Sequence, residues 1–374
     1  MTKLRVVLAV LALALTTSAC SGRATPESTR TSAPTPTAAP APTDTPRSIE
    51  GNYFTPYQNN PVLTKGAPGS WDAETVFSSY ITFHDGLYHM FYNGIASPGL
   101  DTMAIGYATS ADGRSFTKHA SNPILAGDES GFDARRVGYG VPLIEEDAWI
   151  LYYNAGGTKR GLGKTIGRAT APTPSGPWVR RQQPVLVVGS SGEWDSLSIV
   201  PESAVATEEG YVMYYSGEYS YYDEDGRPVG VIMIGMATSP DGITWTKYDD
   251  PDTTAPPFAE SDPVLQPGPP DSWDSAMVWE CAVRKVAGDW EMFYTGSNQQ
   301  RIQIGYATSA DGIHWTKHRE NPIFVPEIDP LATETEPPLL AAPSVVADNS
   351  TYTLYYDYGL IPGGIGVATG TIPR

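Results

Sequence analysis

The sequence predicts an all-β fold, a five-bladed β-propeller of four-stranded blades, and three observations lead to this prediction. A tyrosine-rich strand pattern occurs five times, a strand beginning with Ile-Gly follows each copy, and the copies recur at similar intervals. Repeats of fixed length are typical of radial or stacked architectures. The fifth repeat ends before its last strand, and a segment at the start of the folded region matches the missing piece.

Each repeat contains four strand-like pieces. The first piece follows an aromatic-Asp pair in four of the repeats. The second is the tyrosine-rich piece, the third begins with Ile-Gly, and the fourth runs into an Asn-Pro-like motif. In three repeats an Asp-Gly pair before the fourth piece supplies the positive φ that a tight hairpin needs. The tyrosine-rich pieces are LYHMFYNG (87–94), WILYYNAG (149–156), YVMYYSG (211–217), WEMFYTG (290–296) and YTLYYDYG (352–359).

The ends of the repeated region predict a closed ring. The last repeat stops at IGVATGTIPR, and YFTPYQNNPVL (53–63) has the pattern of the fourth piece that it lacks. Pairing these two segments would leave no open sheet edge. The tyrosine-rich pieces are apolar on both faces, which indicates sheets sandwiched between other sheets, as propeller blades are.

One interval is longer than the others because of two insertions, at residues 218–230 and 249–262. Long loops on a rigid scaffold often carry function, and sequence drift on a solvated rim is the alternative.

The N-terminus reads as an export and anchoring segment. Residues 1–19 combine a basic start, a short apolar run and small residues, which is typical of a signal peptide. Ala19-Cys20 resembles a lipoprotein cleavage site, so we expect lipidation at Cys20, with ordinary secretory cleavage as the alternative. Residues 20–48 are rich in Pro and Thr and predict a disordered tether, while residues 49–374 form the propeller.

The amino-acid composition narrows the classes of molecule that the protein is expected to bind. The chain has 24 basic and 42 acidic residues, a net charge of −18, which argues against nucleic acid as a partner. Nine Trp and 22 Tyr provide surfaces on which carbohydrate rings stack. We therefore expect a monomer that binds carbohydrate and contacts the membrane only through its lipid anchor, on the extracytoplasmic face. Only one other cysteine, Cys281, accompanies Cys20, so no intrachain disulfide is expected.

Two glutamates are the leading candidates for chemistry. The first strand of each propeller blade lines the central channel, and counting back from the tyrosine-rich pieces aligns Ser79, Gly140, Glu202, Glu280 and Pro343. Glu202 and Glu280 would then meet at one end of the channel. Paired carboxylates in a confined site are the apparatus of glycoside hydrolysis. The alternative is a glutamate hydrogen-bonded to neighbouring backbone, although burying one costs free energy.

Other charged residues are weaker candidates. The aromatic-Asp pairs hold Asp72, Asp133, Asp195 and Asp274, and an aspartate repeated around a ring is more often architectural than catalytic. Asp72 is the member best placed for recruitment, because its blade otherwise offers only Glu74. Arg135 and Arg136 break the repeat and either balance the carboxylates, hold sugar hydroxyls or lie on the surface.

Cofactor chemistry has no support in the sequence. The five histidines lack zinc-ligand spacing, and no phosphate loop, nucleophile elbow or dinucleotide fingerprint occurs in a suitable context. We expect no cofactor and no metal at the site, and the sequence leaves a structural calcium ion open.

The repeats YxxYYxG, IGxATSxDGxxWxK and NPVL resemble the five-bladed propeller glycoside hydrolases, which include families 43, 32 and 130. The resemblance covers nearly all of 49–374 and implies action on plant or microbial glycans, as arabinosidases, xylosidases and fructosidases act. Trp279-Glu280-Cys281 is similar to the family 32 segment whose Glu is the acid/base. Pro201-Glu202-Ser203 is similar to the family 43 segment whose Glu is the general acid.

The chain departs from those families in two blades. Ser78 and Ser79 stand where the first-blade Asp-Pro motif belongs, and Gly140 stands at the second-blade Asp. The leading hypothesis is a surface-anchored glycosidase in which Glu280 or Glu202 is the acid and the other, or Asp72, is the base or nucleophile. Its substrate contacts are expected from Arg135, Arg136, Trp279 and Glu74. The alternatives are a glycan-binding lipoprotein without activity and a scaffold for protein contacts.

Overall fold

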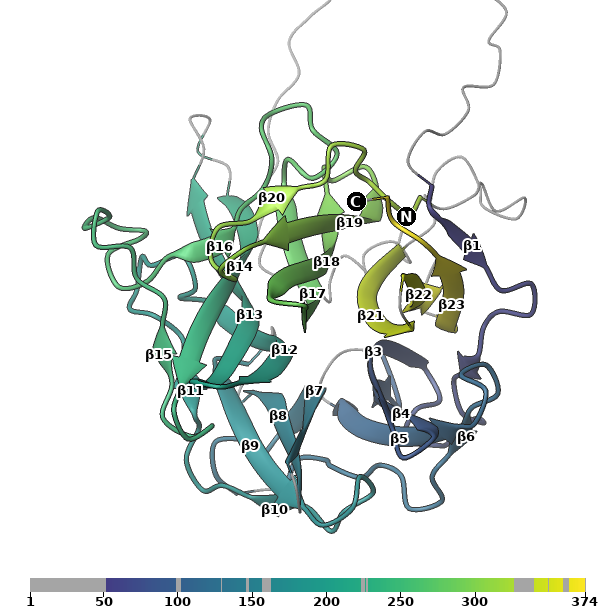
Figure 1. Ribbon diagram of the computed structural model, residues 1–374. Coiled ribbons are helices and arrows are strands. Elements are labelled where there is room, and N and C mark those ends of the chain that lie inside the picture. The colour runs from purple at the N-terminus through teal and green to yellow at the C-terminus, as the bar shows by residue number, and fades with distance from the viewer. Residues whose placement is uncertain are drawn as a thin grey trace, which may run out of the picture.

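The computed structural model describes residues 52–98, 102–128, 130–145, 148–156, 163–222, 226, 228–325, 340–348, 350–358 and 363–373. All regular secondary structure in these ranges is β-strand, and five antiparallel sheets surround a central axis (Figure 1). The five-bladed propeller is therefore confirmed. The expected signal peptide, Cys20 and the tether lie outside the described residues. Within those ranges, no helix is present that is long and apolar enough to cross a membrane.

In blades I to IV the innermost strand comes first in the chain. Blade I contains β3 (Thr75–His84), β4 (Leu87–Ile95), β5 (Ala104–Ser110) and β6 (Thr117–Lys118). Blade II contains β7 (Arg136–Glu145), β8 (Ala148–Gly156), β9 (Thr165–Ala171), β10 (Val179–Arg180) and β11 (Leu186–Val187). Blade III contains β12 (Ser198–Thr207), β13 (Gly210–Tyr222), β14 (Pro228–Ser239), β15 (Thr246–Lys247) and β16 (Pro263–Leu265). Blade IV contains β17 (Met277–Val286), β18 (Asp289–Ser297), β19 (Ile302–Ser309) and β20 (Thr316–Lys317).

Blade V joins the two ends of the folded region. It contains β21 (Leu340–Asp348), β22 (Thr351–Tyr358), β23 (Gly364–Gly370), β1 (Phe54–Pro56) and β2 (Leu63–Thr64). Phe54 pairs with Gly370 and Leu63 pairs with Ile365, both antiparallel. The predicted closure by the N-terminal segment is thus confirmed, and the ring has no free gap between its first and last strands.

The repeated tyrosines and Asp-Gly turns join one blade to the next. The Tyr152 hydroxyl of blade II donates a 2.8 Å hydrogen bond to the Gly242 carbonyl in the turn of blade III. Tyr214 makes the same bond to Gly312, and Tyr355 to Gly113. These turn glycines have positive φ, and a Cβ would lie 2.6–2.8 Å from the tyrosine oxygen. The motif is therefore needed both for the hairpin and for blade-to-blade packing.

The aromatic-Asp pairs are also architectural in their contacts. Each aspartate is buried and forms an ion pair with a basic side chain of the outermost strand of its own blade. The pairs are Asp72 with Lys118 at 2.5 Å, Asp133 with Arg180 at 2.9 Å, Asp195 with Lys247 at 2.5 Å and Asp274 with Lys317 at 2.6 Å. A middle-strand tyrosine also donates to each aspartate. This arrangement explains why the pair recurs.

The insertion at 249–262 packs against the outer part of blades II and III. The Trp194 indole N–H donates to the Ser261 hydroxyl at 3.1 Å, and Phe258 packs on the core between these blades. The backbone N–H groups of Ala259 and Glu260 donate to the buried Glu193 carboxylate. This insertion therefore contributes to blade packing.

Candidate active site

The pairing register of each inner strand shifts near the middle of the strand. The five inner strands surround the central axis (Figure 1). Four inner strands place one non-glycine residue at positive φ here, between 42° and 54°: Ser78, Tyr139, Glu280 and Ala342. Such residues are uncommon and tend to cluster at functional sites. In the remaining inner strand, β12, Pro201 occupies this position, and the proline ring holds φ near −65°. The unpaired residue of that strand is instead Glu202, between Pro201 and Ser203.

The predicted alignment of Glu202 with Glu280 is wrong by one residue. Val200 pairs with Ser216, and Trp279 pairs with Thr295, the equivalent residue of the next blade. Glu280 therefore corresponds to Pro201, and Glu202 corresponds to Cys281. The inner hairpins have turns of equal length, so counting from equivalent tyrosines already places Glu280 one residue earlier. The two carboxylates reach the axis from successive positions of the irregular segment.

The structure nevertheless brings Glu202 and Glu280 together. The Ser216 hydroxyl donates to Oε1 of Glu202 at 2.7 Å and accepts the backbone N–H of Glu280 at 3.2 Å. The Ser78 hydroxyl donates to Oε1 of Glu280 at 2.9 Å, and the Tyr80 hydroxyl donates to Oε2 of Glu202 at 3.2 Å. Ser78 and Tyr80 lie on the same strand, β3, so one strand contacts both carboxylates.

A ring of polar side chains on the middle strands supports the irregular segments. These residues follow the repeated tyrosine: Asn93, Asn154, Ser216, Thr295 and Asp357. Four of them accept a backbone N–H from the next blade, from Tyr139, Glu280, Ala342 and Ser78, at 2.7–3.2 Å. Asn154 faces Pro201, which has no N–H, and donates to the Ile199 carbonyl instead. Buried backbone donors need such partners, which explains the ring.

Asp357 is a third buried acid that the sequence analysis missed. Its Oδ1 accepts the Ser78 N–H at 2.7 Å, which places it next to the residue that contacts Glu280. The available signal was its position in the fifth repeat, where the equivalent residues of the other blades are uncharged. Its role in the ring is to accept a backbone hydrogen bond, and its charge is additional to that role.

Burial shifts the ionisation of all three acids. Glu202, Glu280 and Asp357 are 3%, 8% and 4% exposed. Desolvation raises the pKa of Glu202 well above its usual value, and repulsion from Glu280 raises it further. The same two causes raise the pKa of Asp357. Desolvation raises the pKa of Glu280 to about 7, while the Ser78 hydrogen bond opposes the shift. Burial and the neighbouring acid therefore favour the protonated form of Glu202, while the pKa of Glu280 lies near neutral pH.

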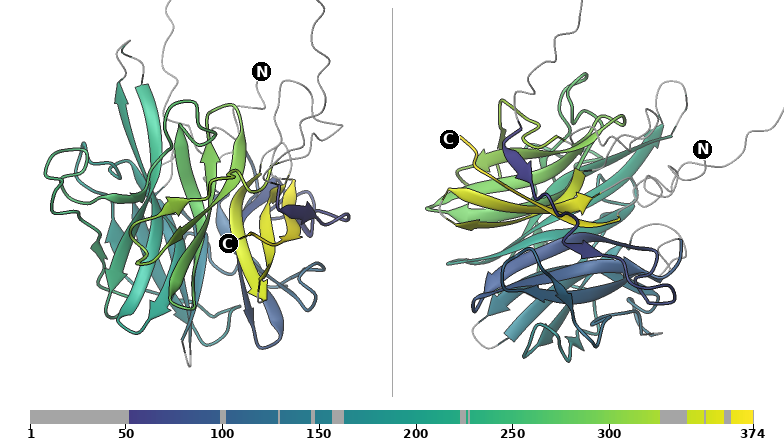
Figure 2. Two further views of the ribbon diagram at one scale, coloured as in Figure 1. Left: turned by 45° about the horizontal axis from the view of Figure 1, so that its top comes forward. Right: turned by 90° about the vertical axis from the view of Figure 1, so that its right-hand side faces the viewer.

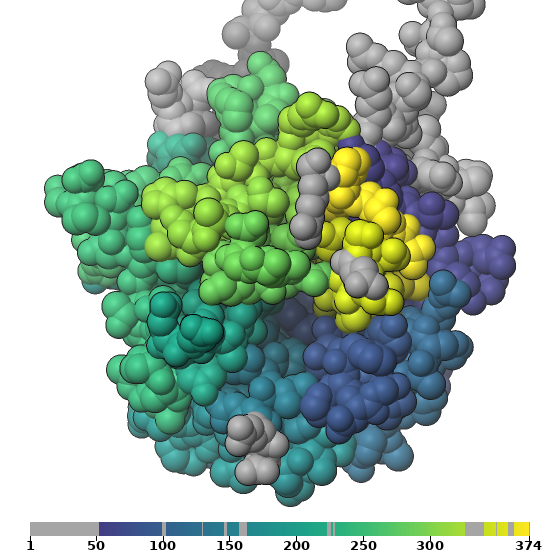
Figure 3. Space-filling view, viewed as in Figure 1, coloured from purple at the N-terminus to yellow at the C-terminus, as the bar shows by residue number. Residues whose placement is uncertain are grey.

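Two small cavities flank the glutamates. One, of about 20 Å³, is lined by Glu202, Glu280, Trp279, Tyr139 and Glu218, among others. The second, of about 10 Å³, lies against Ser78, Ser79 and Tyr80. Such volumes hold about one water molecule, whereas ligand pockets usually span roughly 300–1,000 Å³. The space-filling view shows only a narrow hollow at the centre of the ring (Figure 3).

Glu218 is a second acid that the sequence analysis did not single out. It lines the larger of the two cavities, burial raises its pKa, and the Ser198 hydroxyl donates to its Oε2 at 2.8 Å. It is the first residue of the insertion at 218–230, which was the only signal in the sequence.

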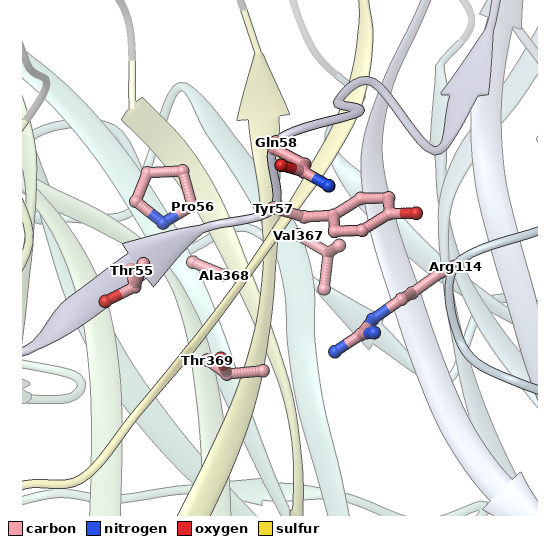
Figure 4. Close-up of a pocket in the computed structure, with 8 residues that line it drawn as sticks. All are labelled: Thr55, Pro56, Tyr57, Gln58, Arg114, Val367, Ala368 and Thr369. Atoms are coloured by element: carbon pink, nitrogen blue, oxygen red, sulfur yellow. The ribbon is translucent and has the colours of Figure 1, made fainter.

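A larger cavity lies away from the carboxylates. It measures about 320 Å³ and forms where β1 and β23 meet the turn between β5 and β6 of blade I (Figure 4). The Arg114 guanidinium lies 5.0 Å from the centre of the Tyr57 ring, beside Gln58. No acidic side chain lines this cavity, so it offers no acid-base pair. Its size therefore does not make it the better candidate for the active site.

The remaining predicted site residues divide into two groups. Trp279 is buried and lines the 20 Å³ cavity. Arg136 is buried at the start of β7, and its charge acts on the phenol of Tyr139. Asp72, Glu74 and Arg135 line neither cavity at the glutamates: Asp72 is held by Lys118, Glu74 is half-buried before β3, and Arg135 is exposed. In the described part of the chain, no three acidic, histidine or cysteine side chains are grouped to hold a metal ion.

Comparisons with known proteins bear on the fold. No protein-family model matches the chain. A β-1,2-mannobiose phosphorylase of Thermoanaerobacter sp. (strain X514) is 29% identical over 111 residues, which is 26% of this chain and 35% of that protein. The chain thus matches about a third of that relative's length.

Solved structures match over most of the chain. A glycosyl hydrolase from Bacteroides ovatus has a TM-score of 0.65 at 17% identity, over 86% of this chain and 94% of its own. A structure titled for GH130 glycoside hydrolases that target β-1,2-mannosidic linkages in Candida mannan has a TM-score of 0.62 at 17% identity, over 88% and 98%. A thermostable family-43 glycoside hydrolase gives 0.56 at 17% identity, over 83% and 93%. The structural neighbours are glycoside hydrolase propellers, and at these identities the likeness establishes the fold.

Proposed function

We propose that the chain is a glycan-processing enzyme that cleaves glycosidic bonds with Glu202 and Glu280. One observation carries the proposal: two buried glutamates from adjacent blades meet at Ser216, whose hydroxyl donates to the Glu202 carboxyl and accepts the backbone N–H of Glu280. Burying acids without function costs free energy, and groups with shifted pKa values cluster at active sites. The propeller fold shared with glycoside hydrolases supports the same reaction class.

The two glutamates divide the acid and base roles. Burial and the nearby Glu280 raise the pKa of Glu202 and favour its protonated form, so Glu202 is the acid that gives its proton to the leaving glycosidic oxygen as the C–O bond breaks. Glu280, with its pKa raised to about 7, is the ionised partner. It takes a proton from the water that attacks the anomeric carbon, or attacks that carbon itself. Trp279 and Glu218 line the adjoining cavity and would contact the sugar.

The candidate substrates are drawn from the resemblance and from the names of similar proteins. Arabinosides, xylosides and fructosides come from the resemblance to families 43 and 32. β-1,2-Mannosides are added to these candidates because the names of two similar proteins refer to that linkage. One of those names is a phosphorylase, so release of sugar phosphate in phosphate buffer has to be measured beside hydrolysis.

A non-catalytic glycan-binding protein is the second candidate. The cavities beside the glutamates hold water but not a sugar ring. Ser78, Ser79 and Gly140 also stand where the resembled families have carboxylates. In this alternative the acids only support the irregular inner strands.

We also propose that the protein is displayed on the cell surface by lipid attached to Cys20. The support is the sequence of residues 1–20 alone. Replacing Cys20 with Ser should shift the protein from the membrane fraction to the soluble fraction. Unchanged fractionation would contradict the anchor.

The test of activity uses matched glutamine variants. Purified protein is incubated with aryl glycosides and with arabino-, xylo-, fructo- and β-1,2-manno-oligosaccharides, and sugar release is measured with and without phosphate. Glu280→Gln and Glu202→Gln should each lower turnover by about 100-fold or more, the usual worth of acid-base catalysis. Glu74→Gln is the control because this half-buried glutamate lines neither cavity. Full activity of Glu280→Gln would refute the assignment, and binding without any turnover would favour the second candidate.

A further inference from the structure

We infer that the extended hairpin formed by β13 and β14 is a binding platform for the part of a glycan chain that lies beyond the acid pair. The site would then accept a neutral polysaccharide or long oligosaccharide in preference to a disaccharide. This inference rests on the proposed function for the position of the cleaved bond. The evidence for the platform itself is separate and comes from the hairpin.

The hairpin is a regular extension of blade III. Strand β13 has 13 residues, whereas its counterparts in the other blades have eight or nine. Strand β14 has 12, whereas its counterparts have seven or eight. Antiparallel pairing continues without a break from Ser216 and Ile234 out to Tyr222 and Pro228. The strands therefore project as a ribbon beyond the neighbouring blades (Figure 2). The insertion at 218–230 accordingly contains strand at both ends.

Three tyrosines cover the projecting part of β13. Tyr219 and Tyr221 lie on one face, with ring centroids 6.0 Å apart and planes at 28°. Tyr221 is 46% exposed and Tyr222 is 76% exposed. Tyr222 lies on the opposite face of the strand, because successive side chains alternate. Single exposed apolar residues are common, but this narrow ribbon offers aromatic rings on both of its faces. Tyrosine offers a rigid amphipathic ring at low entropy cost, which suits contact with a sugar.

The face of β13 that carries Tyr222 leads back to the acid pair. Side chains two residues apart in a strand share a face, so Ser216, Glu218 and Tyr222 lie on the same side. Ser216 binds Glu202, and Glu218 lines the cavity beside it. At about 3.3 Å per residue, Tyr222 is roughly 20 Å along the strand from Ser216. A glycan with one bond at Glu202 would need several sugar rings to reach it.

The charge of the surface selects the class of occupant. The described strand residues from Tyr219 to Tyr222 and from Val229 to Ile232 include no charged side chain. The chain as a whole carries a net charge of −18, which repels an anionic polymer. A neutral glycan fits both observations.

The test compares two exposed aromatic residues at opposite ends of the propeller. Tyr222→Ala removes the most exposed ring of the platform. Phe83→Ala is the control, because Phe83 is 51% exposed and lies next to the β3–β4 turn, at the opposite end of the inner strands. Both variants are made in the Glu280→Gln background, so that binding is measured without cleavage. Mannan, arabinoxylan and inulin in native affinity gels are the probes.

We expect at least one polymer to retard the parent protein, and Tyr222→Ala to weaken that binding about fivefold or more. Phe83→Ala should not change it. With Glu280 restored, turnover of a disaccharide or aryl glycoside should be unaffected by Tyr222→Ala. Retardation by none of the three polymers, or equal binding by both variants, would overturn the inference. If polymer binding depends on Tyr222 but no substrate is cleaved, the platform stands and the proposed hydrolysis fails.

Discussion

The Ser78 hydroxyl donates a 2.9 Å hydrogen bond to Oε1 of Glu280, although blade V separates the blades that carry these two residues. Tyr80 similarly contacts Glu202 across blade II. The centre of the ring is therefore narrow enough for side chains of non-adjacent blades to meet. Blade I lacks the carboxylate found in the resembled families and contributes two hydroxyl donors to the acids instead.

The contact between Ser78 and Glu280 predicts a shift in the pH dependence of turnover. The hydroxyl stabilises the ionised form of Glu280 and so lowers its pKa. Ser78→Ala should raise that pKa by about one unit, because a hydrogen bond to a charged group contributes about 1.5–3 kcal/mol. With Glu280 as the base, the acidic limb of the rate profile should move to higher pH by the same amount.

Ser79→Ala is the matched control for this measurement. Ser79 is equally buried and adjacent in sequence, yet its hydroxyl makes no hydrogen bond to any described residue. Its removal should leave the acidic limb in place. Equal shifts in the two variants would show that the contact does not set the pKa of Glu280.

The raised pKa of Glu280 also predicts how stability depends on pH. In the unfolded chain a glutamate titrates near pH 4.3, whereas in the folded protein the pKa of Glu280 is about 7. Between these values the native state keeps a proton that the unfolded state has lost. The free energy of unfolding should therefore fall as pH rises through this window, by about 4 kcal/mol in total from this group.

Glu280→Gln removes that contribution, since the amide does not ionise. Urea denaturation of both proteins at about pH 4.5, 6 and 7.5 would measure the difference. The variant should gain stability relative to the parent as pH rises. A constant difference across the three values would contradict the raised pKa.

The repeat explains why most of the fold was predictable. The tyrosines, turn glycines and aspartates recur because each makes the same contact in several blades, such as Tyr152 with Gly242 or Asp72 with Lys118. Blade number and ring closure then follow from counting repeats. The meeting of Glu202 and Glu280 followed from their place on inner strands.

The details of the site depend on features that a repeat does not encode. The irregular segment adds one residue to each inner strand, and beside Pro201 the unpaired residue is Glu202, which is not the equivalent of Glu280. Contacts across the ring, such as Tyr80 with Glu202, join blades that are distant in sequence. In the sequence, Asp357 is one more polar residue at the position that follows the repeated tyrosine. Burial raises the pKa of its carboxyl group, and repulsion from the nearby Glu280 raises it further.

The ion pair of Asp72 predicts a structural role for this residue. Asp72→Asn should lower the free energy of unfolding by about 1–3 kcal/mol, because Lys118 loses its buried partner but remains partly exposed to water. Turnover per folded molecule should be unchanged. Asp274→Asn, in the equivalent ion pair with Lys317, should cost a similar amount. If only Asp72→Asn abolished turnover, Asp72 would be catalytic after all.

Closure of the ring predicts that β1 is essential for stability. Phe54 on β1 is buried, and its ring centroid lies 6.3 Å from that of Phe293 and 5.8 Å from that of Phe324, so it ties the N-terminal strand to blades IV and V. Phe54→Ala should lower the free energy of unfolding by about 3–5 kcal/mol, the usual cost of removing a buried aromatic ring. The next residue, Thr55, is exposed on the same strand, so Thr55→Ala should change stability little. Thermal melting of the two variants would decide, because equal melting temperatures would mean that the ring does not depend on this strand.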